Sequence, residues 1–160
     1  MRKYSTWLLP IAWMGIIYYS SATPYEEQDI KPMMENTIDL SFLTPFLDWI
    51  VFTYHQSEVS VEALGINGFL EFFIRKGAHV GAFFLLMCFF VIAFQKSTKL
   101  VLSSTIIVSF LLTVAYAVVD EYHQGFTANR TPYIGDVVLD GVGALLGVIF
   151  ILLVIRYQNR

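Results

Sequence analysis

Three long apolar stretches constrain this chain more than any other feature. They span residues 77–94, 100–119 and 137–155, and within them Asp140 is the only Asp, Glu, Lys or Arg. A helix needs about 17 to 25 mainly apolar residues to cross roughly 30 Å of hydrocarbon, so each stretch predicts a membrane-spanning helix. The composition agrees, because 56% of the residues are hydrophobic and 14% are charged, against about 25% charged residues in a soluble domain.

A fourth, shorter apolar stretch occupies about residues 4–20. Tryptophan and tyrosine side chains lie along it, which is typical of a retained anchor with aromatic residues at the membrane interface. A basic pair before it and the small residues Ser20-Ser21-Ala22 after it also resemble a cleaved signal peptide, and this alternative stays open. If the stretch is retained, the sequence predicts an all-α fold, an integral membrane bundle of four transmembrane helices, forming a single domain over residues 1–160.

The basic residues predict the orientation of this bundle. With four crossings, Lys and Arg residues flank the termini and the short connection between the second and third crossings, whereas all thirteen acids lie between Glu26 and Asp140. Because basic residues favour the cytoplasmic side, we expect both termini in the cytoplasm. The basic residues on that side are Arg2, Lys3, Lys96, Lys99, Arg156 and Arg160.

The connection between the first two crossings, about residues 21–74, is too long to be a plain connector. Apolar and polar residues mix from residue 38 to residue 54, which predicts an amphipathic helix lying on the membrane surface. This extracytoplasmic segment either covers the bundle or forms a lid over a binding cleft.

Carboxylates interrupt the apolar pattern around the last two crossings. Each costs about 2.5 to 3.5 kcal/mol at the centre of a membrane helix, so it persists where it finds partners, water or a ligand. Helical spacing places Asp120 and Gln124 on a polar face of the third crossing. It places Asp136 and Asp140 in line with Gly143, within a stripe of small residues that lets another helix approach. We therefore expect these carboxylates to face the interior of the bundle.

One polar site on the extracytoplasmic side follows from this spacing. In one interpretation the arginine and lysine side chains of this site only neutralise its buried acids. In another they hold the phosphate of a ligand, while the carboxylates and imidazoles provide acid–base chemistry; both interpretations are compatible. The candidate catalytic residues are Asp120, Glu121 and His123. The candidate ligand-binding residues are Arg75, Lys76, His79, Asp120, Glu121, Gln124, Arg130, Asp136 and Asp140.

The order of these residues carries a family resemblance. The segments concerned are Arg75-Lys76-Gly77-Ala78-His79 and the series Asp120-Glu121, Gln124, Phe126, Arg130, Asp136, Asp140, Gly143 and Gly147. This pattern resembles the VanZ family, although Phe83 replaces a common tyrosine and Asp140 a usual asparagine. The resemblance implies a small multi-pass protein of the bacterial cytoplasmic membrane that contributes to resistance against teicoplanin-type glycopeptides. It implies no particular reaction.

Three functions are compatible with these residues. The preferred hypothesis is non-catalytic binding of a lipid head, a lipid-linked cell-wall precursor or a lipoglycopeptide. The second is an intramembrane hydrolase or transferase that acts on a phosphorylated or acylated lipid, although the sequence contains no nucleophile elbow or zinc-protease helix. The third is a lipid transporter or flippase, for which four helices form too thin a bundle unless a homo-oligomer assembles.

Partners and cofactors follow from the same features. Membrane lipids are the expected partners, and nucleic acid is excluded because the pI is about 5.5 and no basic stripe exists. No cofactor is expected, since the chain lacks a glycine-rich phosphate loop. No metal is expected either, because nearby cations oppose it and the acids and histidines lack a dense ligand spacing.

Overall fold

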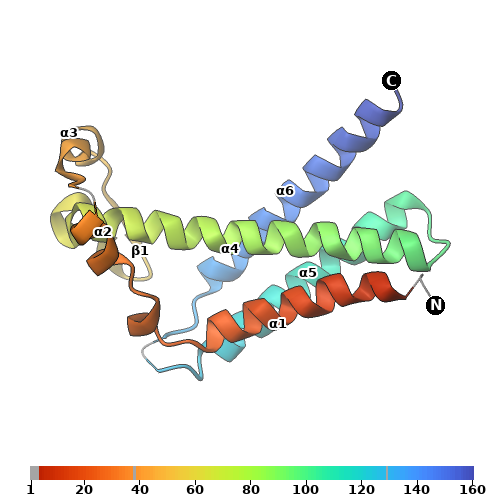
Figure 1. The fold of residues 1–160 in the computed structure, drawn as a ribbon, viewed down its shortest axis with the longest axis horizontal. Helices are drawn as coiled ribbons and strands as arrows, with labels where there is room; N and C mark the ends of the chain where they lie inside the picture. Colours follow the sequence, from red (N-terminus) through yellow and green to blue (C-terminus); the bar gives the residue numbers. More distant parts are fainter. Residues whose placement is uncertain (1–3, 38, 129) are drawn as a thin grey trace. The chain divides into compact units, whose positions relative to one another are not determined.

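The computed structural model describes residues 4–37, 39–128 and 130–160. These residues are mostly helical (Figure 1). The chain divides into two compact units. The first combines the residues up to Pro24 with His79–Arg160, and the second comprises Tyr25–Ala78.

Three of the described helices are long and apolar enough to cross a membrane. They are α4 (Val61–Ser97), α5 (Leu102–Gln124) and α6 (Ile134–Gln158). Each covers all or nearly all of one of the three long apolar stretches, so the predicted helices at these positions are confirmed.

The N-terminal apolar stretch forms a shorter helix. A 3₁₀ turn over Ser5–Trp7 leads into α1 (Leu8–Ala22), which has 15 residues. At 1.5 Å per residue this α-helix is about 22 Å long, less than the hydrocarbon thickness of a bilayer. A bundle of four crossings therefore stays a prediction.

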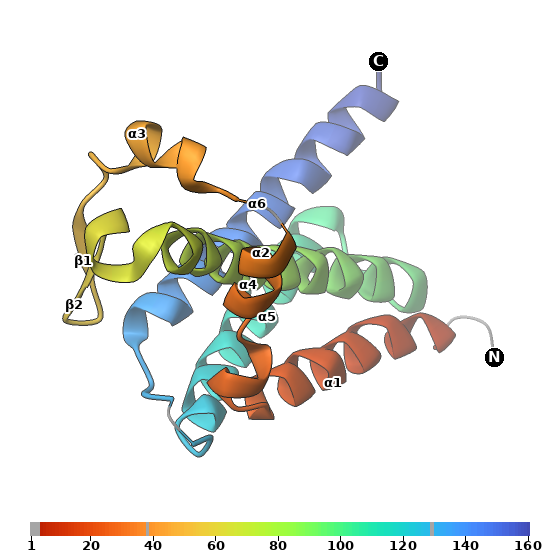
Figure 2. The same cartoon turned by 60° about the vertical axis from the view of Figure 1, so that its left-hand side comes forward.

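The first unit is built from α1, the part of α4 after Ala78, α5 and α6. Helix α1 lies beside α5, and α5 lies beside α6 (Figure 1 and Figure 2). Phe83, Leu86 and Phe90 of α4 form a buried core with Ile17 of α1 and Ala117 of α5. Hydrophobic contacts thus join α1 and α5 to α4.

Helix α6 approaches α4 through glycines. A Cβ atom added at Gly143 would collide with the backbone carbonyl of Val80. One added at Gly147 would lie 2.9 Å from Cγ of Met87 and 3.2 Å from the carbonyl oxygen of Phe84. The close approach that the small-residue stripe predicted is therefore confirmed.

The second unit contains short elements and the start of α4. The predicted surface helix over residues 38–54 is wrong for most of its length, because the helical segment there ends at Leu47 and a two-stranded hairpin follows; residue 38 itself lies outside the described residues. The elements are a 3₁₀ turn at Tyr25–Gln28, α2 (Lys31–Thr37), a 3₁₀ turn at Ser41–Leu43, α3 (Thr44–Leu47), β1 (Phe52–Tyr54) and β2 (Ser57–Val59).

The hairpin has a local cause. His55 and Gln56 between the strands have φ angles of 48° and 63°, and positive φ at both central residues defines the turn whose twist suits a two-residue hairpin loop. Phe52 pairs with Val59 across the antiparallel strands. Aromatic and β-branched residues favour such strands, and Val59 packs in a buried cluster with Phe69 of α4.

Candidate functional site

The polar face of α5 points into the first unit. Thr105, Ser109 and Thr113 are buried, and so are Asp120 and Gln124 at the end of the helix. The inward orientation predicted for Asp120 and Gln124 from their spacing is confirmed.

Helix α5 continues past the apolar stretch that ends at residue 119 and runs through the charged cluster to Gln124. Residues 120–124 include neither glycine nor proline, the two strongest helix breakers, and Gly125 is the C-cap. Asp120 therefore lies within the helix.

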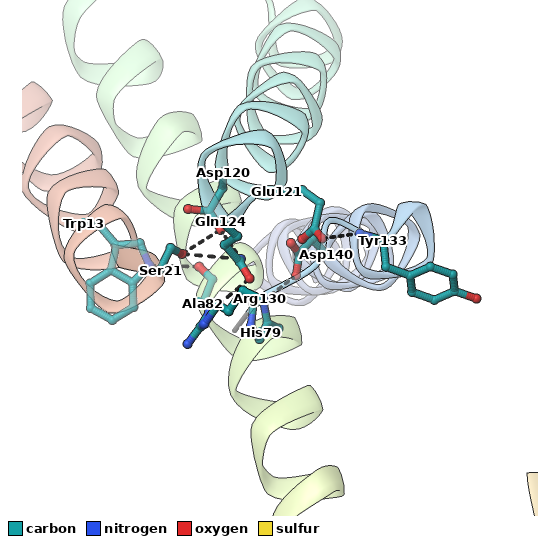
Figure 3. Close-up of polar contacts among 10 residues, drawn as sticks. All are labelled: Trp13, Ser21, His79, Ala82, Asp120, Glu121, Gln124, Arg130, Tyr133 and Asp140. Carbon is teal, nitrogen blue, oxygen red and sulfur yellow. Dashed lines mark hydrogen bonds and ion pairs between the residues drawn. The ribbon is translucent and has the colours of Figure 1, made fainter. Parts of the chain in front are cut away.

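Asp120 is the centre of a hydrogen-bond network between α1, α5 and the following loop (Figure 3). Asp120 is only 2% exposed. Ser21 Oγ donates to Asp120 Oδ2 at 2.9 Å, and Gln124 Nε2 donates to the same oxygen at 3.0 Å. Arg130 Nη1 donates to Gln124 Oε1 at 3.1 Å. The guanidinium of Arg130 thus stabilises the carboxylate through the amide of Gln124.

Glu121 connects α5 to the start of α6. Its Oε1 accepts a hydrogen bond from the backbone N–H of Tyr133, the N-cap residue of α6, at 2.6 Å. Glu121 therefore helps to fix where α6 begins. Asp136 lies in the first turn of α6, where a negative charge interacts favourably with the helix dipole.

A histidine–carboxylate pair joins α4 to α6 (Figure 3). His79 Nδ1 lies 3.3 Å from Asp140 Oδ1, and Asp140 is 0% exposed. The contact has ion-pair distance without hydrogen-bond geometry. A fully buried carboxylate needs such a partner, because an unpaired charge in this environment is costly.

Several carboxylate oxygens in these networks are buried without a hydrogen-bond partner among the described residues. They are Asp120 Oδ1, Glu121 Oε2 and both oxygens of Asp140. Buried polar atoms in folded proteins are nearly always paired. The first unit thus presents acceptors suited to a group that donates hydrogen bonds or carries positive charge.

His123 has surroundings that its sequence position did not predict. Its ring stacks on that of Tyr18 in α1, with centroids 4.0 Å apart and planes at 20°. Its Nδ1 is buried and has no hydrogen-bond partner in the part of the chain that is described. The imidazole of His79, by contrast, lies within ion-pair distance of a carboxylate.

Arg75 and Lys76 belong to the second unit, whereas the other predicted site residues belong to the first. Arg75 Nη2 lies 2.7 Å from Oε1 of Glu71, four residues earlier on α4. Lys76 Nζ lies 4.5 Å from the centroid of the Tyr54 ring. Glu71 is not among the residues predicted from the sequence, although a spacing of four on a helix is the usual signal for such a pair.

Ser21 is a further site residue that sequence reasoning missed. It lies 99 residues from Asp120 in the chain, so no local spacing relates the two.

As to metals, the described residues contain no group of three or more His, Cys, Asp or Glu side chains that could hold an ion.

These helices and their buried polar residues define a membrane protein with a buried polar network. A model of the VanZ/LLP1 family matches residues 6–155, and the chain therefore belongs to this family. The resemblance drawn from the sequence motifs is thereby confirmed. No curated protein and no solved structure matches the chain.

Proposed function

We propose that this protein binds the polar head of a lipid, a lipid-linked cell-wall precursor or a lipoglycopeptide at the polar network of its first unit. The observation that carries the proposal is the burial of Asp120, Glu121 and Asp140 with carboxylate oxygens that lack a hydrogen-bond donor. Hydroxyl, amide and ammonium groups of such a head would donate to these oxygens.

The energetics favour a ligand over a purely structural role. A buried acceptor left without a partner costs about 1 to 3 kcal/mol, and more when it is charged. A network that served only the fold would be expected to pair both oxygens of each acid. Binding of a hydrogen-bond donor would offset this cost.

The family supplies the expected physiological role, since VanZ-like proteins are linked to glycopeptide resistance at the level of the family. We propose that the site lies on the extracytoplasmic side of the bacterial cytoplasmic membrane. There, binding of the precursor or of the drug would lower the access of the antibiotic to its target.

Mass spectrometry of the lipids that co-purify with the full-length protein tests the ligand. We expect a polar lipid or precursor to accompany the wild type and to be lost from Asp120→Asn and Asp140→Asn. Asp39→Asn is the matched control, because Asp39 is an exposed carboxylate that accepts from the neighbouring Ser41 N–H. Equal lipid content in wild type and both site variants would overturn the proposal.

The His79–Asp140 pair favours one alternative, an intramembrane hydrolase or transferase acting on a phosphorylated or acylated lipid. An imidazole 3.3 Å from a carboxylate is a common arrangement for general acid–base catalysis. Turnover of a co-purified lipid by the wild type, abolished in Asp140→Asn while the lipid stays bound, would favour this alternative over simple binding.

A further inference from the structure

A second candidate site lies entirely within the second unit. A groove of about 260 Å³ is lined there by cations and by apolar side chains. Lys31 of α2 contributes one cation, and Arg75 and Lys76 of α4 contribute two more. Leu64 and Phe72 supply apolar walls.

A buried carboxylate holds two of these cations in place. Glu71 also lines the groove, and its side chain is 3% exposed. Its Oε1 accepts from Arg75 Nη2 at 2.7 Å, and its Oε2 lies 4.0 Å from Lys31 Nζ. Lys31 Nζ is also 3.3 Å from Oδ2 of Asp29. Two cations from different helices are therefore fixed near one another.

The third cation is positioned by aromatic rings. Lys76 Nζ lies 4.5 Å from the centroid of Tyr54 and 5.7 Å from that of Phe72, distances at which an ammonium is attracted to a ring face. With three cations against the carboxylates of Glu71 and Asp29, the formal charge around the groove is +1. The groove thus favours an anion.

We propose that this groove binds the phosphate of a membrane-lipid headgroup. Arg and Lys are the side chains that recognise phosphate, Arg by paired N–H donors and Lys as a point charge. Leu64 and Phe72 would contact the glycerol and the first methylene groups of the lipid. The site uses other residues than the polar network of the first unit and goes beyond the function proposed for it.

The second unit also has features that suit a lipid source for this phosphate. Phe42, Phe46 and Trp49 are exposed, with Trp49 at 76%. Exposed aromatic residues of this kind are typical of segments that lie in the membrane interface. A unit that lies in the membrane interface would have its groove within reach of lipid headgroups.

Native mass spectrometry of the full-length protein in detergent tests this inference. Phosphatidic acid, diacylglycerol with the same acyl chains, and inorganic phosphate are the three probes. We expect phosphatidic acid to bind at least about tenfold more tightly than diacylglycerol, because charge-assisted hydrogen bonds are lost with the phosphate. Inorganic phosphate should not displace it. Equal binding of both lipids, or displacement by inorganic phosphate, would overturn the proposal.

Variants assign the binding to the groove. The double variant Lys31→Gln/Lys76→Gln should weaken phosphatidic-acid binding by about tenfold or more, since two charged donors are removed. It leaves the Glu71–Arg75 ion pair intact, so its fold is expected to persist, and circular dichroism checks this. Lys96→Gln/Lys99→Gln removes the same charge outside the groove and should bind like the wild type. Wild-type binding by the first double variant would refute the assignment.

The two proposals can fail separately. The groove variants leave Asp120, Glu121 and Asp140 unchanged, and their readout is added phosphatidic acid. Co-purified lipid measured with Asp120→Asn and Asp140→Asn tests the first unit alone.

Discussion

At the scale of single residues, Asp120 shows which contacts a sequence can predict. Its place on the same inner face as Gln124 follows from the helical repeat, which holds for any α-helix. Its bond with Ser21 depends on how α1 packs against α5 and joins residues 99 positions apart. Spacing therefore predicted the carboxylate and the amide of the site but not the serine.

Ser21→Ala tests the weight of that packing contact. The variant removes one of the two hydrogen bonds donated to Asp120 Oδ2, and leaving a buried charged acceptor underpaired costs about 1 to 3 kcal/mol. We expect a lower free energy of unfolding, measured by thermal denaturation in detergent. Ser103→Ala, at an exposed position of α5, should unfold like the wild type. Identical stability of the two variants would show that the Ser21 bond contributes nothing.

Loss of resistance is the second prediction at this scale. Asp120→Ala, Glu121→Ala and Arg130→Ala each remove a member of the polar network. If the network binds the drug or its target, each variant should abolish teicoplanin protection without lowering the amount of protein in the membrane. Drug susceptibility and immunoblots of membranes, measured together in cells that the wild type protects, decide this. Wild-type protection by all three at equal abundance would contradict the site assignment.

At the scale of elements, long apolar stretches were predicted well and short mixed ones were not. The apolar parts of α4, α5 and α6 follow from hydropathy alone, because a helix of that length satisfies its own backbone across a bilayer. The start of α4 does not, because α4 begins at Val61, within the connection predicted over about residues 21–74. The segment from residue 38 to residue 54 is too short and mixed for period to separate helix from strand. Its hairpin turn, His55-Gln56, lacks the Asn-Gly or Asp-Gly pair that usually identifies such a loop.

Helix packing gives a prediction with a control on the same helix. In Gly143→Ala the new methyl group would meet the backbone of Val80, which cannot move aside as a flexible side chain can. Overpacking of this kind costs typically about 1 to 3 kcal/mol, so we expect a lower melting temperature. A Cβ at Gly141 meets nothing within 4 Å, and Gly141→Ala should melt at or above the wild-type temperature. Equal melting of the two variants would mean that α6 does not approach α4 at Gly143.

At the scale of the whole molecule, the number of membrane crossings decides on which side of the membrane the polar residues of each unit lie. Composition and the family both indicate a membrane protein, but α1 has only 15 residues. Its packing supports a place in the bundle, because Trp13 Nε1 donates to the carbonyl of Ala82 in α4 at 2.8 Å and Ile17 belongs to the core with Phe83. Hydropathy alone does not predict that α1 packs in the bundle, because this packing depends on contacts between helices.

Cysteine labelling tests the predicted topology. Cys88 is the one cysteine of the chain, so Cys88→Ala gives a background for single cysteines. With both termini in the cytoplasm, a membrane-impermeant maleimide added to intact cells should label Glu62→Cys and Ala128→Cys. It should label Lys99→Cys and Asn159→Cys only after the membrane is permeabilised, because α4, α5 and α6 each reverse the side. Labelling of Lys99→Cys in intact cells would mean that the orientation is the reverse. The carboxylates of the polar network would then lie at the cytoplasmic end of the bundle. A cell-wall precursor exposed on the outer surface or an external glycopeptide could not reach them there.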